Sequence, residues 1–369
     1  MRIFHIDRQR RWGGQIGRLY REANGAHEAG HEVGVVASPG SALADRARAA
    51  GWDVITLPMR GWPFYPAILH LAAALRARQV DILHAHGARD HLMATVAAPL
   101  AGVKALIRNK HNHTRLRHGA FSRIPYNRCA RVVAISEFVR ELLIEDGISP
   151  DHVVTIQTSI DLERFTPRAR NEELMRELGL TPDDIIVGNL SSLHRRKGID
   201  TLLHAFKLMQ GAPYANRLKC VFIGKRWEKW VPLAQELGIA DRVVFKGFTD
   251  DVPDALSVFD VYLAASREEA LGTAVLEAMA MQRPVVVSRV GGLRESVTPE
   301  TGVHVEPDDA AGFAAAARAI IEDPERARAM GEAGRGRVQE HYSVKTMVRR
   351  MLDLYEDVLQ NGRRRKALL

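Results

Sequence analysis

The sequence predicts an α/β protein of two doubly wound, parallel-sheet domains of the Rossmann-like kind that face a central cleft. Three observations favour this fold class. A chain of 369 residues is too long for one ordinary hydrophobic core. Short apolar runs alternate with amphipathic stretches, which is the pattern of parallel strands covered by helices on both faces. That alternation stops at a charged segment near 161–181, which contains Pro167, and then restarts.

In the first half, strand-like and helix-like segments follow one another in order. The expected strands are short apolar runs: Arg2–Ile6, Glu32–Ala37, Val54–Leu57, Asp81–Ala85, Ala105–Arg108 and Arg131–Ile135. The expected helices lie near 15–29, 41–50, 64–78, 88–100 and 137–146. Gly30 ends the first of these helices, because glycine readily adopts the left-handed conformation found at many helix ends.

The second half repeats this alternation. Its expected strands are Ile185–Leu190, Leu218–Gly224, Val243–Phe245, Val261–Ala264, Pro284–Ser288 and Val303–Val305. Its expected helices lie near 198–210, 228–237, 273–282 and 309–322, followed by a helical tail from about 324 to 360. We therefore expect one domain at 1–165 and a second at 166–369, with a C-terminal helix at about 344–360 that crosses back to the first domain.

The composition is that of a cytoplasmic protein. Charged residues interrupt the first seven positions, so we expect no signal peptide. The longest weakly polar run, 92–107, is broken by Lys104 and is shorter than the ~20 residues that a membrane span needs. Cys129 and Cys220 fall in different predicted domains without a Cys or His at metal-ligand spacing. A disulfide or a zinc site is therefore not expected.

The positive charge of the chain is concentrated in its first half. Residues 1–167 carry 22 Lys and Arg against 15 Asp and Glu, whereas residues 168–369 carry 30 against 29. From His91 to Ser136 there is no acidic residue. This basic block predicts an anionic partner, although a solvated face with counter-charges elsewhere in the fold is the alternative. We expect no nucleic-acid partner, because no recognised nucleic-acid motif is present.

Two loops at predicted strand ends favour phosphate binding. Gly13-Gly14 precedes the first helix, where paired glycines let a ligand approach the backbone, although a plain tight turn explains the pair equally well. Arg195, Arg196 and Lys197 follow the first strand of the second half and open a helix. Cations are unfavourable at the positive end of a helix, so we expect an anion that neutralises them, with a basic surface turn as the alternative.

The segment 266–288 is the most informative part of the sequence. Glu269 and Glu277 stand eight positions apart and flank a predicted helix start at Thr273. The N–H groups at that start, including those of Gly272 and Thr273, have no intrahelical partner and can donate to a diphosphate or a sugar oxygen. Because ionised carboxylates accept bidentate hydrogen bonds, one glutamate can hold a sugar and the other a ribose.

This pattern resembles family 4 of the retaining glycosyltransferases, which have the GT-B fold. Glu269 and Glu277 match the two glutamates of the E-x7-E motif of that family. Further motifs occur in family order over nearly the whole chain: Gly13-Gly14, Asp81-Ile-Leu-His-Ala-His86, Ala134-Ile-Ser-Glu137, Ile160-Asp161, Arg196-Lys197-Gly198 and Glu277-Ala-Met-Ala280. The Arg-Lys-Gly variant and the basic first domain look most like the lipopolysaccharide core glucosyltransferases.

The resemblance implies a nucleotide-sugar donor on the second domain, with a UDP-linked hexose or N-acetylhexosamine as the default. Glu269 would bind the donor sugar near the reacting centre, and Glu277 would bind the ribose hydroxyls. Arg196 and Lys197 would neutralise the diphosphate without a metal ion or another cofactor. The Gly13-Gly14 backbone would approach the same diphosphate from the first domain.

The resemblance also implies an acceptor on the first domain, a glycan or glycolipid such as lipopolysaccharide. His111 matches the family histidine beside the transferred sugar, with His86 and then His113 as the alternatives. The segment 115–126 interleaves basic with apolar side chains, which suits a phosphorylated glycolipid or peripheral attachment at the inner face of an anionic membrane. A helix packed on its own domain is the alternative for this segment.

Three departures from the family pattern leave the donor open. They border the expected nucleotide pocket and are Ser191-Ser192 in place of an arginine, Thr158-Ser159 in place of Asn-Gly, and Gly224-Lys-Arg226 in place of Gly-x-Gly.

A sugar-nucleotide epimerase of the same fold and a non-catalytic relative that binds an anionic ligand are the alternative functions. Asp250-Asp251 could suggest a metal site, but an acidic first turn of a helix explains the pair better.

Overall fold

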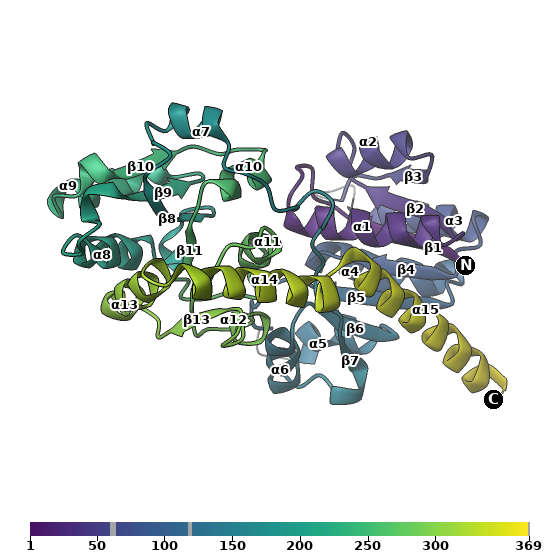
Figure 1. Cartoon of the computed structure of the whole chain (residues 1–369). Coiled ribbons are helices and arrows are strands. Elements are labelled where there is room, and N and C mark those ends of the chain that lie inside the picture. The colour runs from purple at the N-terminus through teal and green to yellow at the C-terminus, as the bar shows by residue number, and fades with distance from the viewer. Residues whose placement is uncertain (60–63, 117–119, 368–369) are drawn as a thin grey trace. The chain divides into compact units, whose positions relative to one another are not determined.

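The computed structural model describes residues 1–59, 64–116 and 120–367. Clustering of contacts divides the chain into two compact units. Unit 1 comprises Met1–Ser159 and Val344–Leu369, and unit 2 comprises Ile160–Ser343. Each unit is built on a parallel sheet flanked by helices (Figure 1). The predicted pair of Rossmann-like domains is therefore confirmed.

The sheet of unit 1 has the strand order β3-β2-β1-β4-β5-β6-β7. Its strands are β1 (Arg2–Asp7), β2 (Glu32–Ala37), β3 (Asp53–Thr56), β4 (Ile82–Ala85), β5 (Ala105–Lys110), β6 (Arg131–Ala134) and β7 (Val153–Thr155). Its helices are α1 (Gly14–Glu28), α2 (Ala42–Ala49), α3 (Phe64–Ala77), α4 (Ala88–Ala101), α5 (Ala120–Asn127), α6 (Glu137–Glu145) and α15 (Val344–Ala367). The strand order reverses between β1 and β4, and ligands bind at such switch points in doubly wound folds.

The sheet of unit 2 has the order β10-β9-β8-β11-β12-β13 and reverses between β8 and β11. Its strands are β8 (Ile185–Leu190), β9 (Leu218–Ile223), β10 (Val243–Lys246), β11 (Val261–Ala264), β12 (Val285–Ser288) and β13 (Gly302–Val305). Its helices are α7 (Glu172–Glu177), α8 (Ile199–Met209), α9 (Val231–Glu236), α10 (Val252–Ser257), α11 (Thr273–Ala280), α12 (Leu293–Ser296), α13 (Ala310–Ile321) and α14 (Pro324–His341).

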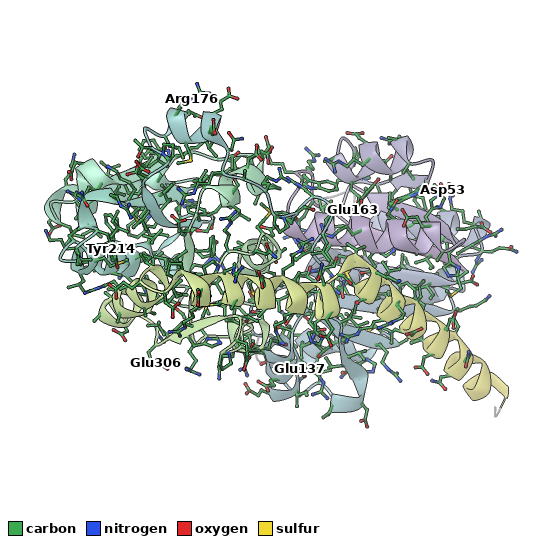
Figure 2. The ribbon with its side chains drawn as sticks, viewed as in Figure 1. Asp53, Glu137, Glu163, Arg176, Tyr214 and Glu306 are labelled. Atoms are coloured by element: carbon green, nitrogen blue, oxygen red, sulfur yellow. The ribbon has the colours of Figure 1, made fainter. Side chains whose placement is uncertain are left out.

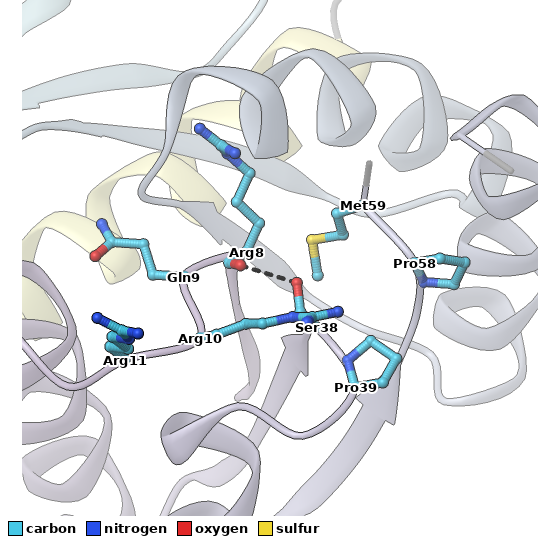
Figure 3. Close-up of a pocket in the computed structure, with 8 residues that line it drawn as sticks. All are labelled: Arg8, Gln9, Arg10, Arg11, Ser38, Pro39, Pro58 and Met59. Atoms are coloured by element: carbon cyan, nitrogen blue, oxygen red, sulfur yellow. Dashed lines mark hydrogen bonds between the residues drawn. The ribbon is translucent and has the colours of Figure 1, made fainter. Parts of the chain in front are cut away.

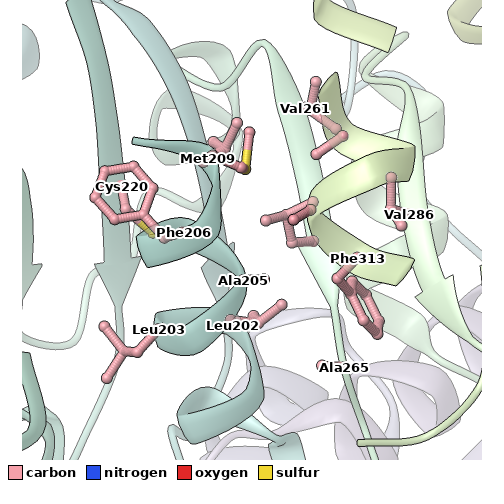
Figure 4. Packing of buried hydrophobic residues seen from close by; sticks show 14 of the residues in the cluster. Leu202, Leu203, Ala205, Phe206, Met209, Cys220, Val261, Ala265, Val286 and Phe313 are labelled. Atoms are coloured by element: carbon pink, nitrogen blue, oxygen red, sulfur yellow. The ribbon is translucent and has the colours of Figure 1, made fainter. Parts of the chain in front are cut away.

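Apolar side chains from the sheet and its helices form a separate core in each unit. Figure 4 shows part of the unit 2 core, where Phe206 of α8 and Phe313 of α13 pack near Val261 and Val286 of neighbouring strands. Cys220 is free and buried in this core, and Cys129 is free and buried in unit 1. Burial of each such large side chain contributes about 1.5–3 kcal/mol, so the cores hold the two switch points in place.

The C-terminal helix α15 is part of unit 1 and packs against α1. The close approach of these helices depends on Gly25 of α1. A Cβ at this position would overlap the side chain of Val348 on α15. Because α15 contributes Tyr355 to the interior of unit 1, residues from the two ends of the chain share one core.

Two segments differ from the sequence-based expectation. The charged stretch near 161–181 contains the helix α7, whose cap Asn171 accepts a hydrogen bond from the N–H of Leu174 (2.9 Å) (Arg176 of this helix is labelled in Figure 2). The helical tail is two helices, because the chain leaves the helical conformation at Tyr342, with φ −122° and ψ 16°, before α15 begins at Val344. There the carbonyl of Tyr342 accepts a hydrogen bond from the N–H of Ile160 (2.8 Å).

Candidate active site

The switch point of unit 2 brings together two loops that lie far apart in the sequence. One loop follows β8 and forms a single 3₁₀ turn, Arg195–Lys197, and the other follows β11. The N–H of Arg267 donates to the carbonyl of Arg196 (2.8 Å). Gly198 has a φ of 63°, and a Cβ there would overlap the carbonyl of Ala265. Glycine at 198 is therefore what allows the two loops to touch.

Lys197 and Glu269 meet at this junction. The Lys197 ammonium donates to the Glu269 carboxylate, and the hydroxyl of Ser266 donates to the same carboxylate (3.4 Å). The side chains of Lys197 and Glu269 keep 18% and 19% of their surface exposed, so a ligand can reach both. Arg196, in the same turn, is exposed. The structure thus brings together three of the predicted site residues.

Helix α11 begins beside this pair. Gly272 caps the helix with a φ of 90° and offers no side chain to satisfy the first N–H groups. The loop before the cap is held by the N–H of Gly292, which donates to the carbonyl of Glu269 (3.1 Å). Thr273 starts the helix, and Glu277 follows one turn later, half-buried. Hydrogen-bond donors, two carboxylates and two cations therefore gather at one edge of the unit 2 sheet.

In unit 1, Gly13 and Gly14 lie in the loop after β1, at the start of α1. Both are exposed, and a Cβ on either would meet nothing within 4 Å. Packing within the chain therefore does not require glycine at these positions. The predicted contact of this loop with a diphosphate remains a prediction.

The histidines that the sequence offered as alternatives are in direct contact. Nε2 of His111, which follows β5, lies 3.1 Å from Nδ1 of His86, which follows β4. Both line a cavity of about 520 Å³ at the carboxyl edge of the unit 1 sheet, together with Asn109. Burial lowers the pKa of both histidines well below the usual range, so they are neutral at pH 7. His113 is half-buried in the following loop.

Sequence reasoning missed a carboxylate pair beside the same cavity. Burial and the nearby charge of Asp7 raise the pKa of Asp90 to about 7. Burial also raises the pKa of Asp7, which accepts a hydrogen bond from Gln15 (2.5 Å). Asp90 comes from α4 and Asp7 from β1. No local motif links these two residues, because only the switch-point topology brings them together.

The basic block at 91–136 is partly compensated within unit 1. Lys104 pairs with Asp81 (2.5 Å), and Arg115 pairs with Glu145 (2.6 Å) and Asp146 (2.7 Å). The solvated-face alternative therefore holds for these two cations. Residues 117–119 of the expected acceptor segment lie outside the described residues.

A second basic surface, which the sequence reasoning did not single out, lies in the loop after β1. Arg8, Arg10 and Arg11 line a cavity of about 570 Å³ with Ser38 and Met59 (Figure 3). The Ser38 hydroxyl donates to the carbonyl of Arg8 (2.8 Å) and ties this loop to the end of β2. Within the described part of the chain, Arg10 and Arg11 form no ion pair, and no acidic side chain lines this cavity.

None of the helices among the described residues has both the length and the apolar character that spanning a bilayer requires.

Two family models match consecutive parts of the chain. The model described as Glycosyltransferase Family 4 matches residues 12–164, and the model described as Glycosyl transferases group 1 matches residues 170–337. The first match falls within the amino-terminal segment of unit 1, and the second falls within unit 2.

Named relatives are similar over most of their own length. The lipopolysaccharide core biosynthesis mannosyltransferase LpsB of Rhizobium meliloti is 28% identical over 79% of this chain and 84% of the relative. The N-acetyl-alpha-D-glucosaminyl L-malate synthase of Bacillus anthracis is 27% identical over 80% of each chain.

Solved structures share the whole fold. A glycosyltransferase from Rickettsia africae has a TM-score of 0.85 at 21% identity and covers 98% of this chain and 99% of its own. Anabaena HepE, solved in complex with UDP and glucose, has a TM-score of 0.80 at 20% identity and covers 96% of this chain and 99% of its own. The lipopolysaccharide outer core galactosyltransferase WaaB has a TM-score of 0.71 at 17% identity, with 99% and 100% covered.

Proposed function

Because the chain belongs to the family 4 glycosyltransferases of the GT-B fold, we propose that it transfers a hexose or an N-acetylhexosamine from a UDP-linked donor, with retention at the anomeric carbon, to an anionic glycolipid such as lipopolysaccharide. The observation that carries this proposal is the junction of Lys197, Glu269 and the start of α11 at the unit 2 switch point. That junction offers both charge for a diphosphate and acceptors for sugar hydroxyls.

The proposed chemistry starts from the leaving group. Breaking the bond between sugar and diphosphate places negative charge on the nucleotide diphosphate. Arg196, Lys197 and the first N–H groups of α11 would stabilise that charge in place of a divalent cation. The present ion pair keeps the Lys197 ammonium next to Glu269. A bound diphosphate would compete for this ammonium and leave the carboxylate to accept hydrogen bonds from the sugar.

Glu277 is the proposed ribose ligand. It lies one turn into α11 from Thr273, on the same helix face, because residues four apart are neighbours on a helix. A ribose beside Glu277 and a diphosphate at the start of α11 are consistent with the distance that one helical turn spans, about 5.4 Å. The proposed roles of Glu269 and Glu277 thus differ, with the sugar on the first residue and the nucleoside on the second.

Two comparisons bear on the donor. HepE was solved with UDP and glucose, which favours uridine, whereas LpsB is named a mannosyltransferase, which keeps a GDP-linked mannose as the competing donor. For the acceptor, Arg10 and Arg11, which form no ion pair with any residue that the structure describes, favour a phosphate or carboxylate on the glycolipid. These arginines complement the basic block as the proposed anion-binding surface of unit 1.

A thermal-shift screen against uridine and guanosine nucleotide sugars, with a chelator present, tests the donor site. A donor at ~100 times its dissociation constant should stabilise the protein by roughly 2.7 kcal/mol. We expect a shift with one donor in wild type, loss of that shift in Glu277→Ala, and retention in the exposed control Glu236→Ala of the same unit. No shift with any donor, or equal shifts in all three proteins, would contradict the proposed site.

A further inference from the structure

A chain of buried polar side chains runs from His111 into the interior of unit 1. Nε2 of His111 lies 3.1 Å from Nδ1 of His86, and Nε2 of His86 lies 3.1 Å from Nδ1 of His5 on β1. Nδ2 of Asn109 lies 3.3 Å from the same Nδ1 of His86. Asn109 is only 2% exposed and His86 only 3%, so water does not substitute for these contacts.

The inner end of this chain is anchored by a second group of side chains. His84 is the partner of His5 across the paired strands β1 and β4. Nδ1 of His84 lies 2.8 Å from the carboxylate of Glu22, and the hydroxyl of Tyr355 donates to the same carboxylate (2.6 Å). All of these groups are fully buried, so the packing of unit 1 fixes their positions.

The cluster of His5, Glu22, His84 and His86 has the residue types of a metal site, and its donor atoms lie within 4.8 Å of one another. Its electrostatics favour another interpretation. The buried guanidinium of Arg18 lies 4.0 Å from Glu22, so the cluster already contains a cation for its only carboxylate. A divalent ion would add two uncompensated positive charges to a dry interior.

The hydrogen-bond chemistry of the chain determines where the ring protons lie. Nδ2 of Asn109 faces Nδ1 of His86, and Oδ1 of Asn109 is buried with no hydrogen-bond partner among the described residues. An amide nitrogen can only donate, so this orientation makes Nδ1 of His86 an acceptor without a proton. The proton of neutral His86 is then on Nε2, which donates to His5. Because Nδ1 of His86 is bare, its 3.1 Å contact with Nε2 of His111 is a hydrogen bond only if His111 carries its proton on Nε2. Nδ1 of His86 then shares its one lone pair between Asn109 and His111.

Nδ1 of His111 is thereby left as an acceptor. It has no hydrogen-bond partner among the described residues, and His111 lines the cavity at the edge of the unit 1 sheet. We propose that His86 and Asn109 are positioning residues that hold His111 in its Nε2–H tautomer, so that Nδ1 accepts a hydrogen bond from a hydroxyl of the bound sugar. The identity of that hydroxyl as a sugar group rests on the proposed function, whereas the tautomer does not.

The tautomer is measured directly by ¹⁵N spectroscopy of the imidazole rings in the free, full-length protein, which separates protonated from bare ring nitrogens. Wild type should show His111 protonated at Nε2 and bare at Nδ1. In Asn109→Asp, a carboxylate that can only accept requires a proton on Nδ1 of His86. His111 should then accept at Nε2 and carry its proton on Nδ1.

Asn112→Asp is the matched control. It adds the same charge to the adjacent loop, and its oxygen can still accept from the N–H of Thr114 (3.2 Å in wild type). This control should keep the wild-type tautomer. A second variant, His86→Phe, removes the acceptor and should leave His111 a mixture of both tautomers. A wild-type His111 protonated at Nδ1, or an unchanged His111 tautomer in folded Asn109→Asp and His86→Phe, would overturn the proposal.

The proposed hydrogen bond from the sugar hydroxyl to His111 is tested by the dissociation constant for UDP-glucose. GDP-mannose replaces it if the thermal-shift screen identifies GDP-mannose as the donor. Asn109→Asp should weaken binding roughly tenfold or more, because Nδ1 of His111 then carries a proton where the sugar hydroxyl requires an acceptor. Asn127→Asp, at an exposed position outside the lining of this cavity, should leave the dissociation constant unchanged. A reversed tautomer with unchanged donor affinity would overturn the role in hydroxyl recognition. If wild type binds no nucleotide sugar, the proposed function fails, and the spectra still decide the tautomer.

Discussion

At the switch point of unit 2 the ionisable side chains are partly exposed and form ion pairs, Lys197 with Glu269 and Arg267 with Asp200. At the switch point of unit 1 they are buried, and their pKa values are shifted. The pKa of Asp90 is raised to about 7, and burial lowers the pKa of His5 to about 4. The edge of unit 2 therefore presents partly exposed charge to a ligand, whereas at the edge of unit 1 buried histidines and carboxylates with shifted pKa values lie beside cations such as Arg8 and Lys110.

The difference matches what each edge is proposed to bind. A leaving diphosphate carries charge, so cations that solvent can reach suit it. A sugar hydroxyl is neutral, and it is recognised by a donor or an acceptor whose direction is fixed. Fixing that direction requires buried partners such as Asn109 and His86. Variants at the edge of unit 1 should therefore lose mainly stability, whereas variants at the edge of unit 2 should lose mainly turnover.

The largest effect is expected for Glu22→Gln, which leaves the buried guanidinium of Arg18 without a counter-charge. Burial would raise the pKa of Glu22, but His84, His5 and Arg18 together lower it below its usual range. We expect the variant to lose roughly 3 kcal/mol of unfolding free energy in chemical denaturation at pH 7. This deficit should shrink in acid, because a carboxylate with a lowered pKa stabilises the fold above its unfolded pKa of about 4.3 and loses that contribution as pH falls.

Glu28→Gln on the same helix α1 is the control for that loss, since its carboxylate is exposed and accepts a hydrogen bond from Asn24 (2.7 Å). Equal denaturation midpoints for the two variants would show that Glu22 contributes no more than a surface residue. The proposed contrast between the two sheet edges would then be wrong.

At unit 2, Lys197→Ala should lower turnover strongly and change stability little. We expect turnover with the selected donor to fall by roughly 10²–10³-fold, because the diphosphate loses a fixed cation as its charge develops. Stability should change by less than about 1 kcal/mol, because partly exposed ion pairs contribute little. The measurement is steady-state kinetics beside a thermal melt, with exposed Lys207→Ala on α8 as the control. A Lys197→Ala enzyme with wild-type turnover would remove this residue from the mechanism.

The two edges also differ in how far the sequence could predict them. Glu269 and Glu277 are eight positions apart, and Lys197 lies in the loop after β8, so local spacing identified them. The network of unit 1 depends on strand register, which sets His5 beside His84, and on Tyr355, which lies 271 residues along the chain from His84. No periodicity carries that information. For the same reason His86 and His111 looked like alternatives until the strand order made them neighbours.

The smallest effect is expected at Asp90, where the prediction concerns pH. Burial first, and then the charge of Asp7, raise the pKa of Asp90 to about 7 in the folded protein, against about 3.9 for an unfolded aspartate. A raised pKa means that the folded state binds the proton more tightly. Its contribution to stability is therefore complete below pH 4 and is lost as pH rises through 7. Asp90→Asn cannot ionise and should avoid that loss.

The measurement is the difference in unfolding free energy between pH 5 and pH 8. This difference should be smaller in Asp90→Asn than in wild type by roughly 1–2 kcal/mol. Asp7 and Asp90 titrate together, so the loss of Asp90 alone removes only part of the pH dependence. Exposed Asp45→Asn on α2 should leave the difference unchanged. If Asp90→Asn keeps the wild-type dependence on pH, Asp90 is ionised in the folded protein. The cavity would then hold an ionised carboxylate beside the cations that line it, and the proposed contrast in ionisation between the two sheet edges would be wrong.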